Sequence, residues 1–250
     1  MIRIIMHGCN GKMGQTISRI VSEDDTCEIV AGIDMRDDGH NPYPVFDSLD
    51  KCDAEADCVI DFSTASAVDG LLIYCEKKGI PCVLCTTGLS EAQLKRVEDA
   101  SKKVAILRSA NMSLGINMLL KLLKDAARTL EPAGFDIEIV EKHHNLKLDA
   151  PSGTALALAD SVNEALSEPY EYVYDRSARR EKRPKKEIGI SAVRGGTIVG
   201  DHDVIFAGED EVITFSHRAY SKAVFAKGAV AAAKFLKGKS AGMYGMESVV

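Results

Sequence analysis

The first half of the chain alternates short apolar runs with longer segments whose apolar residues recur at helical spacing. The apolar runs predict strands at residues 2–6, 28–33, 57–62, 82–86 and 104–107. The segments between them predict helices at residues 15–21, 65–78 and 90–102. Because strands that alternate with amphipathic helices form a parallel sheet covered on both faces, we expect a Rossmann-like, doubly wound α/β domain over residues 1–113.

The pattern changes near residue 114. Two further helices are predicted at 116–130 and 154–166, and strands at 135–142, 187–193, 196–207 and 211–218. The turn at 208–210 joins the last two strands as a hairpin. We therefore expect a second, α+β domain over residues 114–221, with a mixed, mainly antiparallel sheet that carries its helices on one face. A subunit interface would cover the other face. The last helix, 223–236, is apolar on much of its surface, and we expect residues 222–250 to complete the first domain.

A glycine-rich loop follows the first strand directly. Gly8, Gly11 and Gly14 are spaced G-x-x-G-x-x-G and lead into a helix, which is where a backbone turns tightly and approaches a pyrophosphate. Asp34 ends the second strand, about twenty residues beyond the last glycine, where an acid binds the adenosine ribose. A plain turn is the alternative. The position of the loop between the first strand and its helix favours dinucleotide binding.

In a doubly wound sheet, ligands gather at the carboxyl ends of the strands. The residues that this rule and the glycine loop select for the cofactor are Gly8, Cys9, Asn10, Gly11, Lys12, Met13, Asp34, Arg36, Phe62, Cys85, Thr86, Thr87, Ser109, Ala110, Asn111 and Met112. The carboxylate of Asp34 disfavours the 2′-phosphate of NADP, whereas Arg36 and Lys12 offer cations to it. The sequence therefore leaves NADH and NADPH both open.

The segment from Glu141 to Thr154 lies between a predicted strand and a predicted helix. It holds two adjacent histidines and Lys147, and it ends in Ser-Gly-Thr at the helix start. A helix start offers unpaired N–H groups and a positive dipole end to an anion. Lysine can hold a carboxylate or give a proton, and histidine titrates near neutral pH. A solvated surface loop with a serine cap is the alternative, but the combination favours a site for a small acidic molecule.

Composition places the chain among ordinary globular proteins. Apolar residues make up 46% and charged residues 27%, and the net charge of −6 argues against a nucleic-acid surface over the whole molecule. The chain has no apolar stretch long enough for a membrane span and no signal-peptide pattern, so we expect a cytoplasmic protein. Its seven scattered cysteines suit reduced thiols. The pair Cys82 and Cys85 has CxxC spacing, but its apolar surroundings favour core packing over a redox or metal site, and no metal site is expected.

Residues 176–186 carry seven positive residues and one negative residue. A nucleic-acid patch is conceivable. The acidity of the rest of the chain favours a mobile, solvated loop instead.

With these residues in view, the chain resembles the bacterial dihydrodipicolinate reductases (4-hydroxy-tetrahydrodipicolinate reductases) of lysine and diaminopimelate biosynthesis, over essentially its whole length. The matching stretches are 8–14, 61–63, 86–88, 111–117, 141–154, 194–196, 200–202, 217–222 and 242–246. The run His-His-Asn-Leu-Lys-Leu-Asp-Ala-Pro-Ser-Gly-Thr at 143–154 is highly specific to that family. Departures are Lys12 and Lys222 where arginine is usual, Cys85 where glycine is common, and Met112 where phenylalanine is common.

The resemblance implies a function. NADH or NADPH would deliver a hydride to C4 of a cyclic dicarboxylate, whose 4-hydroxyl leaves as water, to give tetrahydrodipicolinate. His143 would act as proton donor or acceptor and Lys147 as proton donor, while His144, Gly153 and Thr154 would contact the substrate carboxylates. The resemblance also implies a homotetramer built through the second domain's sheet. Two alternatives are another small dehydrogenase, such as one acting on aspartate, and an NAD(P)-sensing regulator without turnover.

Overall fold

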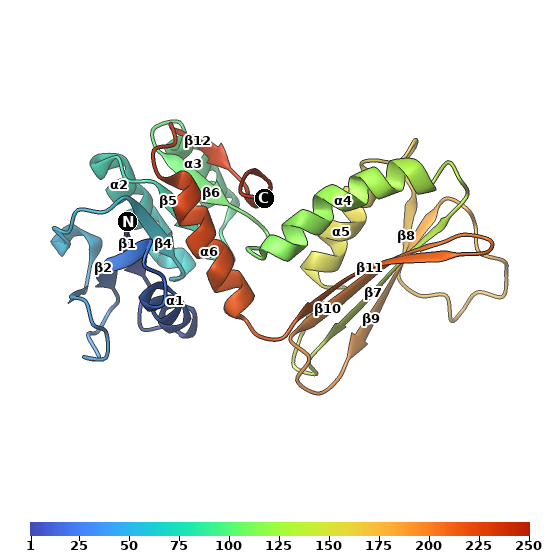
Figure 1. Cartoon of the computed structure of the whole chain (residues 1–250), viewed down its shortest axis with the longest axis horizontal. Coiled ribbons are helices and arrows are strands. Elements are labelled where there is room, and N and C mark those ends of the chain that lie inside the picture. Colours follow the sequence, from blue (N-terminus) through green and yellow to red (C-terminus); the bar gives the residue numbers. More distant parts are fainter. The chain divides into compact units, whose positions relative to one another are not determined.

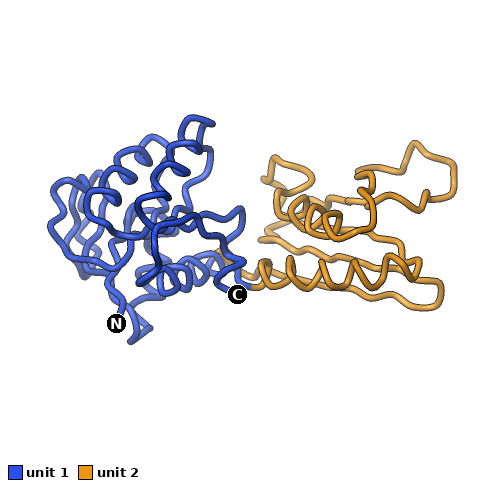
Figure 2. Tube along the Cα trace, turned by 90° about the horizontal axis from the view of Figure 1, so that it is seen from above, with its two compact units in different colours: residues 1–114, 223–250 blue, residues 115–222 orange.

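The computed structural model describes all residues from 1 to 250, and the chain divides into two compact units. Unit 1 comprises Met1–Leu114 and Ala223–Val250, and unit 2 comprises Gly115–Lys222 (Figure 2). Unit 1 is therefore discontinuous in sequence, and unit 2 is inserted into it.

Unit 1 contains one sheet of seven strands in the order β12-β6-β5-β4-β1-β2-β3 (Figure 1). All of its strand pairs are parallel. The strands are β1 (Ile2–His7), β2 (Cys27–Ile33), β3 (Val45–Phe46), β4 (Cys58–Asp61), β5 (Cys82–Leu84), β6 (Ala105–Arg108) and β12 (Gly242–Tyr244). The order reverses after β1, whose two neighbours β2 and β4 are joined to it on opposite sides. Such a reversal opens a crevice at the carboxyl ends of the strands, where doubly wound proteins bind ligands.

Helices cover both faces of this sheet. On one face, α1 (Lys12–Ser22) packs beside α6 (Ala223–Leu236), and both bury apolar side chains against β1 and β4. On the other face lie α2 (Val68–Lys78) and α3 (Glu91–Ser101), which bury Leu71, Leu72 and Val97 with the opposite side chains of the strands. The short 3₁₀ turns are η1 (Leu49–Lys51), η2 (Ala65–Ala67) and η3 (Met246–Ser248). The expected doubly wound α/β fold is confirmed.

Unit 2 is a five-stranded sheet, ordered β11-β10-β7-β9-β8, with two helices packed on one face. Its elements are α4 (Leu114–Leu130), β7 (Asp136–His143), α5 (Gly153–Asn163), β8 (Glu171–Val173), β9 (Glu187–Arg194), β10 (Gly200–Ala207) and β11 (Val212–Ala219). The strands β7, β10 and β11 alternate between more buried and more exposed residues, as a sheet with one covered face requires.

The sheet of unit 2 is mixed, as expected. The β10–β11 hairpin and the β10–β7 pair are antiparallel, whereas β7–β9 and β8–β9 are parallel. The β7–β9 pair is parallel because the chain leaves β7, passes through α5 and β8, and returns beside β7 in the same direction, which is a crossover connection. The sequence analysis did not predict β3, β8 and β12, which are only two or three residues long.

Two local expectations were wrong. The helix expected from residue 65 begins instead at Val68, after the turn η2, and no side chain caps either element. The basic segment is not a freely solvated loop, because three of its arginines form ion pairs with the strands. Arg183 contacts Asp136 and Glu138 at 2.8 and 2.9 Å, and Arg176 and Arg179 contact Glu187.

No helix of the structure is both long enough and apolar enough to cross a membrane.

Candidate functional site

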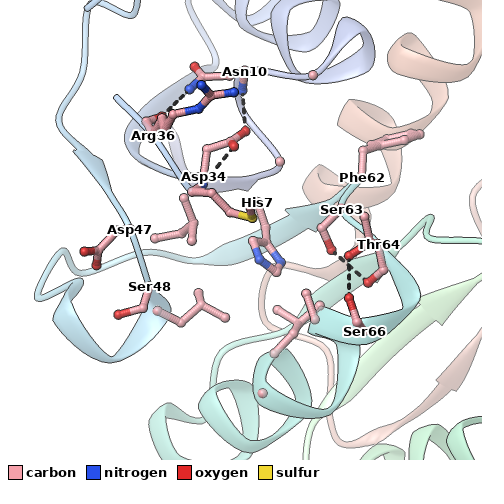
Figure 3. Close-up of a pocket in the computed structure, with 18 of the residues that line it drawn as sticks. His7, Asn10, Asp34, Arg36, Asp47, Ser48, Phe62, Ser63, Thr64 and Ser66 are labelled. Carbon is pink, nitrogen blue, oxygen red and sulfur yellow. Dashed lines mark hydrogen bonds between the residues drawn. The ribbon is translucent and has the colours of Figure 1, made fainter. Parts of the chain in front are cut away.

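A cavity of about 690 Å³ lies within unit 1, at the carboxyl ends of β1, β2 and β4 (Figure 3). Its wall is formed by His7 and the glycine loop, by the segment after β2, by residues 47–50 and by the turn that leads into α2. The cavity thus lies where the order of the strands reverses, at the position expected for a nucleotide.

The glycine loop is shaped for close approach by a ligand. Gly8 has a φ of +82°, and a Cβ on it would lie 2.6 Å from the carbonyl oxygen of Phe62. A Cβ on Gly14 would overlap the backbone of Gly8 and Cys9. No side chain caps α1, whose N-cap residue is Gly11. The first N–H groups of this helix are therefore left to an anion such as a pyrophosphate.

Asp34 lies inside the cavity with its carboxylate held in place. Its Oδ2 accepts a hydrogen bond from the backbone N–H of Asn10 at 2.9 Å, and its Oδ1 accepts one from the N–H of Met35 at 2.8 Å (Figure 3). The Asn10 side chain donates in turn to the carbonyl of Arg36 and accepts from Asn41 at 2.8 Å. These bonds tie the glycine loop to the segment after β2, so the acid and the loop have a fixed spacing.

A buried carboxylate at the end of β4 was missed by the sequence analysis. Asp61 is fully buried, and it accepts hydrogen bonds from the hydroxyls of Ser63 and Thr86, both at 2.6 Å. The Nδ1 atom of His7 lies 2.8 Å from Asp61 Oδ1, at an angle that does not suit a hydrogen bond. Asp61 could have been identified from the sequence by the polar residues at the ends of neighbouring apolar strands. Asp61 lies beside His7, which lines the cavity. The hydrogen bonds around Asp61 therefore stabilise this part of the cavity wall.

The structure brings together some of the residues expected to bind the cofactor. Those that line the cavity are Gly8, Asn10, Gly11, Asp34, Arg36 and Phe62. Those that do not line it are Cys9, Lys12, Met13, Cys85, Thr86, Thr87, Ser109, Ala110, Asn111 and Met112.

Two of these residues contribute to packing. The Cys9 side chain is fully buried against Gly32, and Met112 is buried in the core that holds α6. Burial raises the pKa of the Cys9 thiol to about 11, so this thiol is neutral at physiological pH. Both residues are therefore core side chains whose backbone alone is available to a ligand.

In unit 2, the end of β7 carries a fully buried carboxylate that gathers four donors. Glu141 accepts two hydrogen bonds from Arg194, at 2.7 and 2.8 Å, and one from the backbone N–H of Ser152 at 3.0 Å. Its Oε2 lies 2.6 Å from Nδ1 of His143. Burial by itself raises the pKa of Glu141, but the hydrogen bonds from Arg194, His143 and Ser152 outweigh it and hold the pKa below its ordinary value. Glu141 is therefore an anion that binds strand β9, helix α5 and His143 together.

The imidazole of His143 is buried and oriented by this carboxylate. With Nδ1 directed at Glu141, the other ring nitrogen, Nε2, is the atom left for proton exchange. A Cβ on Gly200 would lie 3.0 Å from Nε2, so the glycine leaves room beside that atom. A histidine held by a buried carboxylate in this way is arranged for general acid–base chemistry.

A second histidine packs against the first. The rings of His143 and His202 lie edge to face with centroids 5.2 Å apart, and His202 Nε2 lies 3.0 Å from Ser152 Oγ. The same Oγ accepts the N–H of Ala155, which caps α5. Burial, and then the charge of His143, lower the pKa of His202 to about 4. His202 is therefore neutral at pH 7 and supports the helix start without adding a charge.

The loop between β7 and α5 places Lys147 beside Asp149. The Nζ atom of Lys147 lies 2.8 Å from Asp149 Oδ1, and the pair lowers the pKa of Asp149. Gly153 begins α5 and is exposed, with open space beside its Cα, and Thr154 follows it. His144 is partly buried, and its Nδ1 makes no hydrogen bond. The residues predicted to act on a substrate are close together in the sequence: His143 ends β7, His144 and Lys147 lie on the loop, and Gly153 and Thr154 begin α5.

Comparison with known proteins identifies the family. Residues 2–112 match the model of the N-terminus of dihydrodipicolinate reductase, and residues 115–250 match the model of its C-terminus. A 4-hydroxy-tetrahydrodipicolinate reductase of Caldanaerobacter subterraneus subsp. tengcongensis is 57% identical over the whole chain and 98% of its own length. One from Clostridium tetani is 50% identical over the whole chain and 97% of its own length.

A solved structure has the same architecture throughout. A dipicolinate-bound dihydrodipicolinate reductase from Paenisporosarcina sp. TG-14 superposes with a TM-score of 0.83 at 26% identity, covering 100% of both chains. The glycine loop, the acid after β2 and the buried Glu141–His143 pair thus lie in a chain whose whole length matches reductases of one kind. The chain belongs to the dihydrodipicolinate reductase family and is an NAD(P)H-dependent oxidoreductase.

Proposed function

We propose that this chain reduces 4-hydroxy-tetrahydrodipicolinate to tetrahydrodipicolinate, with loss of the 4-hydroxyl as water, using NADH or NADPH. The observation that supports this most directly is the loop between β7 and α5, where an oriented histidine and a lysine stand beside a helix start. A dicarboxylate needs cationic and N–H partners, and the reduction needs an acid close to the ring.

The residues of unit 1 fit a dinucleotide. A side chain at Gly8 or Gly14 would overlap the backbone of Phe62 or of the loop itself, so only glycine allows this tight turn, and α1 begins without a side-chain cap. Asp34 and Arg36 line the cavity next to them. We assign Gly8, Asn10 and Gly11 to the pyrophosphate and Asp34 to the adenosine ribose, with Arg36 as the cation for a 2′-phosphate. When bound, the reduced nicotinamide supplies the hydride.

The substrate's carboxylates are assigned to the start of α5 and its neighbours. Gly153 and Thr154 lie at the positive end of the helix, where a carboxylate is stabilised, and Lys147 supplies a cation. His144 keeps a ring nitrogen that is buried and without a hydrogen bond, and a carboxylate would satisfy it. The relative from Paenisporosarcina was solved with dipicolinate, a planar dicarboxylate of the same kind.

His143 and Lys147 are assigned to the protons. Glu141 binds Nδ1 of the imidazole and leaves Nε2 as the atom that exchanges a proton. Loss of the 4-hydroxyl as water, together with a proton from the ring carbon between C4 and the C=N bond, leaves a conjugated imine. Hydride addition at C4 of this imine gives an electron-rich enamine, which takes up a proton at that same carbon. Departure of the hydroxyl and protonation of the enamine each need an acid. His143 is the proton donor or acceptor in this scheme, and Lys147 is a proton donor.

We also propose that the protein is a homotetramer assembled through the open face of the sheet of unit 2. Helices α4 and α5 cover one face, while on the other face of β11 the side chains of Val212, Thr214, Ser216 and Arg218 are exposed. A second copy would cover them. Light scattering coupled to gel filtration measures the mass, and a monomer would refute this assembly.

A coupled assay tests the activity. Nicotinamide absorbance is followed with aspartate semialdehyde, pyruvate and the synthase that condenses them. Oxidation only in the complete mixture supports the reductase. Turnover with aspartate semialdehyde alone, or with aspartate and the oxidised cofactor, would favour another dehydrogenase. Cofactor binding without turnover in any mixture would favour a sensing protein.

A further inference from the structure

The charged group that contacts Lys147 is a carboxylate of the same loop. Asp149 Oδ1 lies 2.8 Å from Lys147 Nζ. The backbone N–H of Gly153, the first residue of α5, also acts on this carboxylate and lowers its pKa. Asp149 thus accepts one interaction from a cation and one from a helix N-terminus, which together make a typical carboxylate site.

These two partners, Lys147 and the Gly153 N–H, are among the groups assigned above to the substrate's carboxylates. A single N–H donates one good hydrogen bond at a time, and two carboxylates on one ammonium repel each other. Asp149 and a substrate carboxylate therefore compete for the same place. We propose that Asp149 is an internal stand-in for the substrate, whose side chain occupies a substrate-carboxylate position in the free enzyme and leaves it when the dicarboxylate binds.

The surroundings of Asp149 allow this exchange without rebuilding the loop. Its backbone carbonyl accepts a hydrogen bond of 2.6 Å from Arg194 Nη2, and Arg194 is itself paired with the buried Glu141. Its side chain, by contrast, is 58% exposed and has solvent to turn into. The main chain is thus held while the carboxylate rotates, so the exchange is a change of side-chain rotamer.

The exchange has two effects. It keeps Lys147 neutralised before the substrate binds, and it makes the enzyme more selective for dicarboxylates. Lys147, whose side chain is only 22% exposed, stays neutralised while the site is free of substrate. An incoming anion must bind better than a carboxylate that is already tethered beside its partners. A second carboxylate on the ligand supplies that advantage. This inference rests on the proposed function, because it uses the same anion position.

Calorimetric titration of the full-length protein with dipicolinate, at saturating NADH, tests the competition. The variants are Asp149→Asn and Asp149→Ala. Lys147→Gln is the control that is expected to lose affinity for dipicolinate. Asp125→Asn is the matched charge control, because Asp125 pairs with Arg128 on the surface of α4. We expect both Asp149 variants to bind dipicolinate about three- to tenfold more tightly than wild type, since they lose a weak competing pair and a like charge. Asp125→Asn should stay within about twofold of wild type, because its pair lies at the surface.

The double variant Lys147→Gln/Asp149→Asn completes a double-mutant cycle for these two residues. If Asp149 acts through Lys147, its removal should tighten binding much less in the Lys147→Gln background than in wild type. A purely structural role of Asp149 predicts weaker binding, which is the opposite sign. Unchanged or weaker binding in both Asp149 variants, with Lys147→Gln still defective, overturns the stand-in and leaves the proposed site intact. Wild-type binding by Lys147→Gln refutes the assigned carboxylate site itself.

Discussion

The Nδ1 atom of His143 lies 2.6 Å from Oε2 of Glu141, and both side chains are buried. Glu141 is held in turn by Arg194 and by the start of α5. The orientation of the imidazole is therefore set by strand β9 and helix α5, and only its Nε2 side is left for chemistry.

Replacing this carboxylate by an amide should slow the reaction. Glu141→Gln keeps the shape but replaces the carboxylate that orients His143 and pairs with Arg194 by a neutral amide. We expect kcat to fall about 10- to 100-fold, as for other groups that orient a functional histidine, and the free energy of unfolding to fall by about 3 kcal/mol. Steady-state kinetics and urea denaturation measure the two effects.

Asp203→Asn is the matched control for this variant. Asp203 forms an ion pair with Lys142 between strands β10 and β7. The variant therefore removes an ion pair from the same sheet without changing a contact of His143. Equal loss of kcat in both variants would show that the effect of Glu141 is a general loss of stability.

The two assigned proton carriers should affect turnover more than binding. His143→Ala and Lys147→Ala should each lower kcat by about 10²–10⁴-fold, the range for a lost general acid. The coupled assay described above measures this loss, and calorimetry shows that NADH still binds. Wild-type turnover in either variant would remove that residue from the mechanism.

The buried His202 should make stability depend on pH between about 6.5 and 4. Its pKa falls from 6.5 to about 4 on folding, so the unfolded chain takes up a proton in this interval while the folded protein does not. The contribution is complete above pH 6.5 and is lost as the pH falls toward 4. Between pH 7 and pH 5, the free energy of unfolding should drop by about 2 kcal/mol from this residue.

The variant His202→Gln isolates that contribution. Urea denaturation of both proteins at pH 7 and at pH 5 should show a smaller drop in the variant, by the same ~2 kcal/mol. An equal drop in both would mean that the imidazole of His202 titrates normally in the folded protein.

Gly8 should be needed for the cofactor because of both its conformation and its neighbour. Gly8→Ala places a Cβ at φ +82°, 2.6 Å from the carbonyl oxygen of Phe62. We expect the affinity for NADH to fall by at least about tenfold, since the loop must shift away from its ligand. Gly79→Ala is the control, because Gly79 also has a positive φ of +66° but open space around it. Fluorescence titration with NADH should find Gly79→Ala close to wild type, and an equal loss in both would refute the argument.

Asp34 should distinguish the two cofactors. Asp34→Ala removes the acid assigned to the adenosine ribose and also a negative charge that opposes a 2′-phosphate. Calorimetry should therefore show a larger loss of affinity for NADH than for NADPH. Equal losses for both would remove the proposed contact with the ribose.

Periodicity was enough to predict the doubly wound unit, because each strand of its sheet is buried on both faces and each helix has one apolar face. It could not predict β3 and β12, since strands of two or three residues show no period. The parallel β7–β9 pair was missed for a different reason. Nothing local indicates that a strand will return through a crossover, and the two antiparallel hairpin strands dominated the pattern.

The sequence was enough to predict the loop of the site, but not the residues that hold its histidine in place. His143 and Lys147 are close in sequence to the helix start, and their residue types indicate chemistry. Arg194 is separated from Glu141 by 53 residues, and the two meet only because His143 lies opposite Arg194 in the register of β7 and β9. The same holds for Asp61 and Thr86, which come from successive strands. The role of a buried charge can be read only once the order of the strands shows which residue is its partner.

The insertion of unit 2 into unit 1 has a consequence for biosynthesis. Helix α6 and strand β12, the last elements of the chain, supply part of the core between α1 and the sheet and also its outermost strand. On the ribosome, residues 115–222 are contiguous and emerge together, so their sheet has all its strands while the nucleotide-binding half still lacks a helix. That half becomes a complete folding unit only once α6 and β12 have been synthesised, and a nascent chain that still lacks them exposes the apolar surface that α6 would cover.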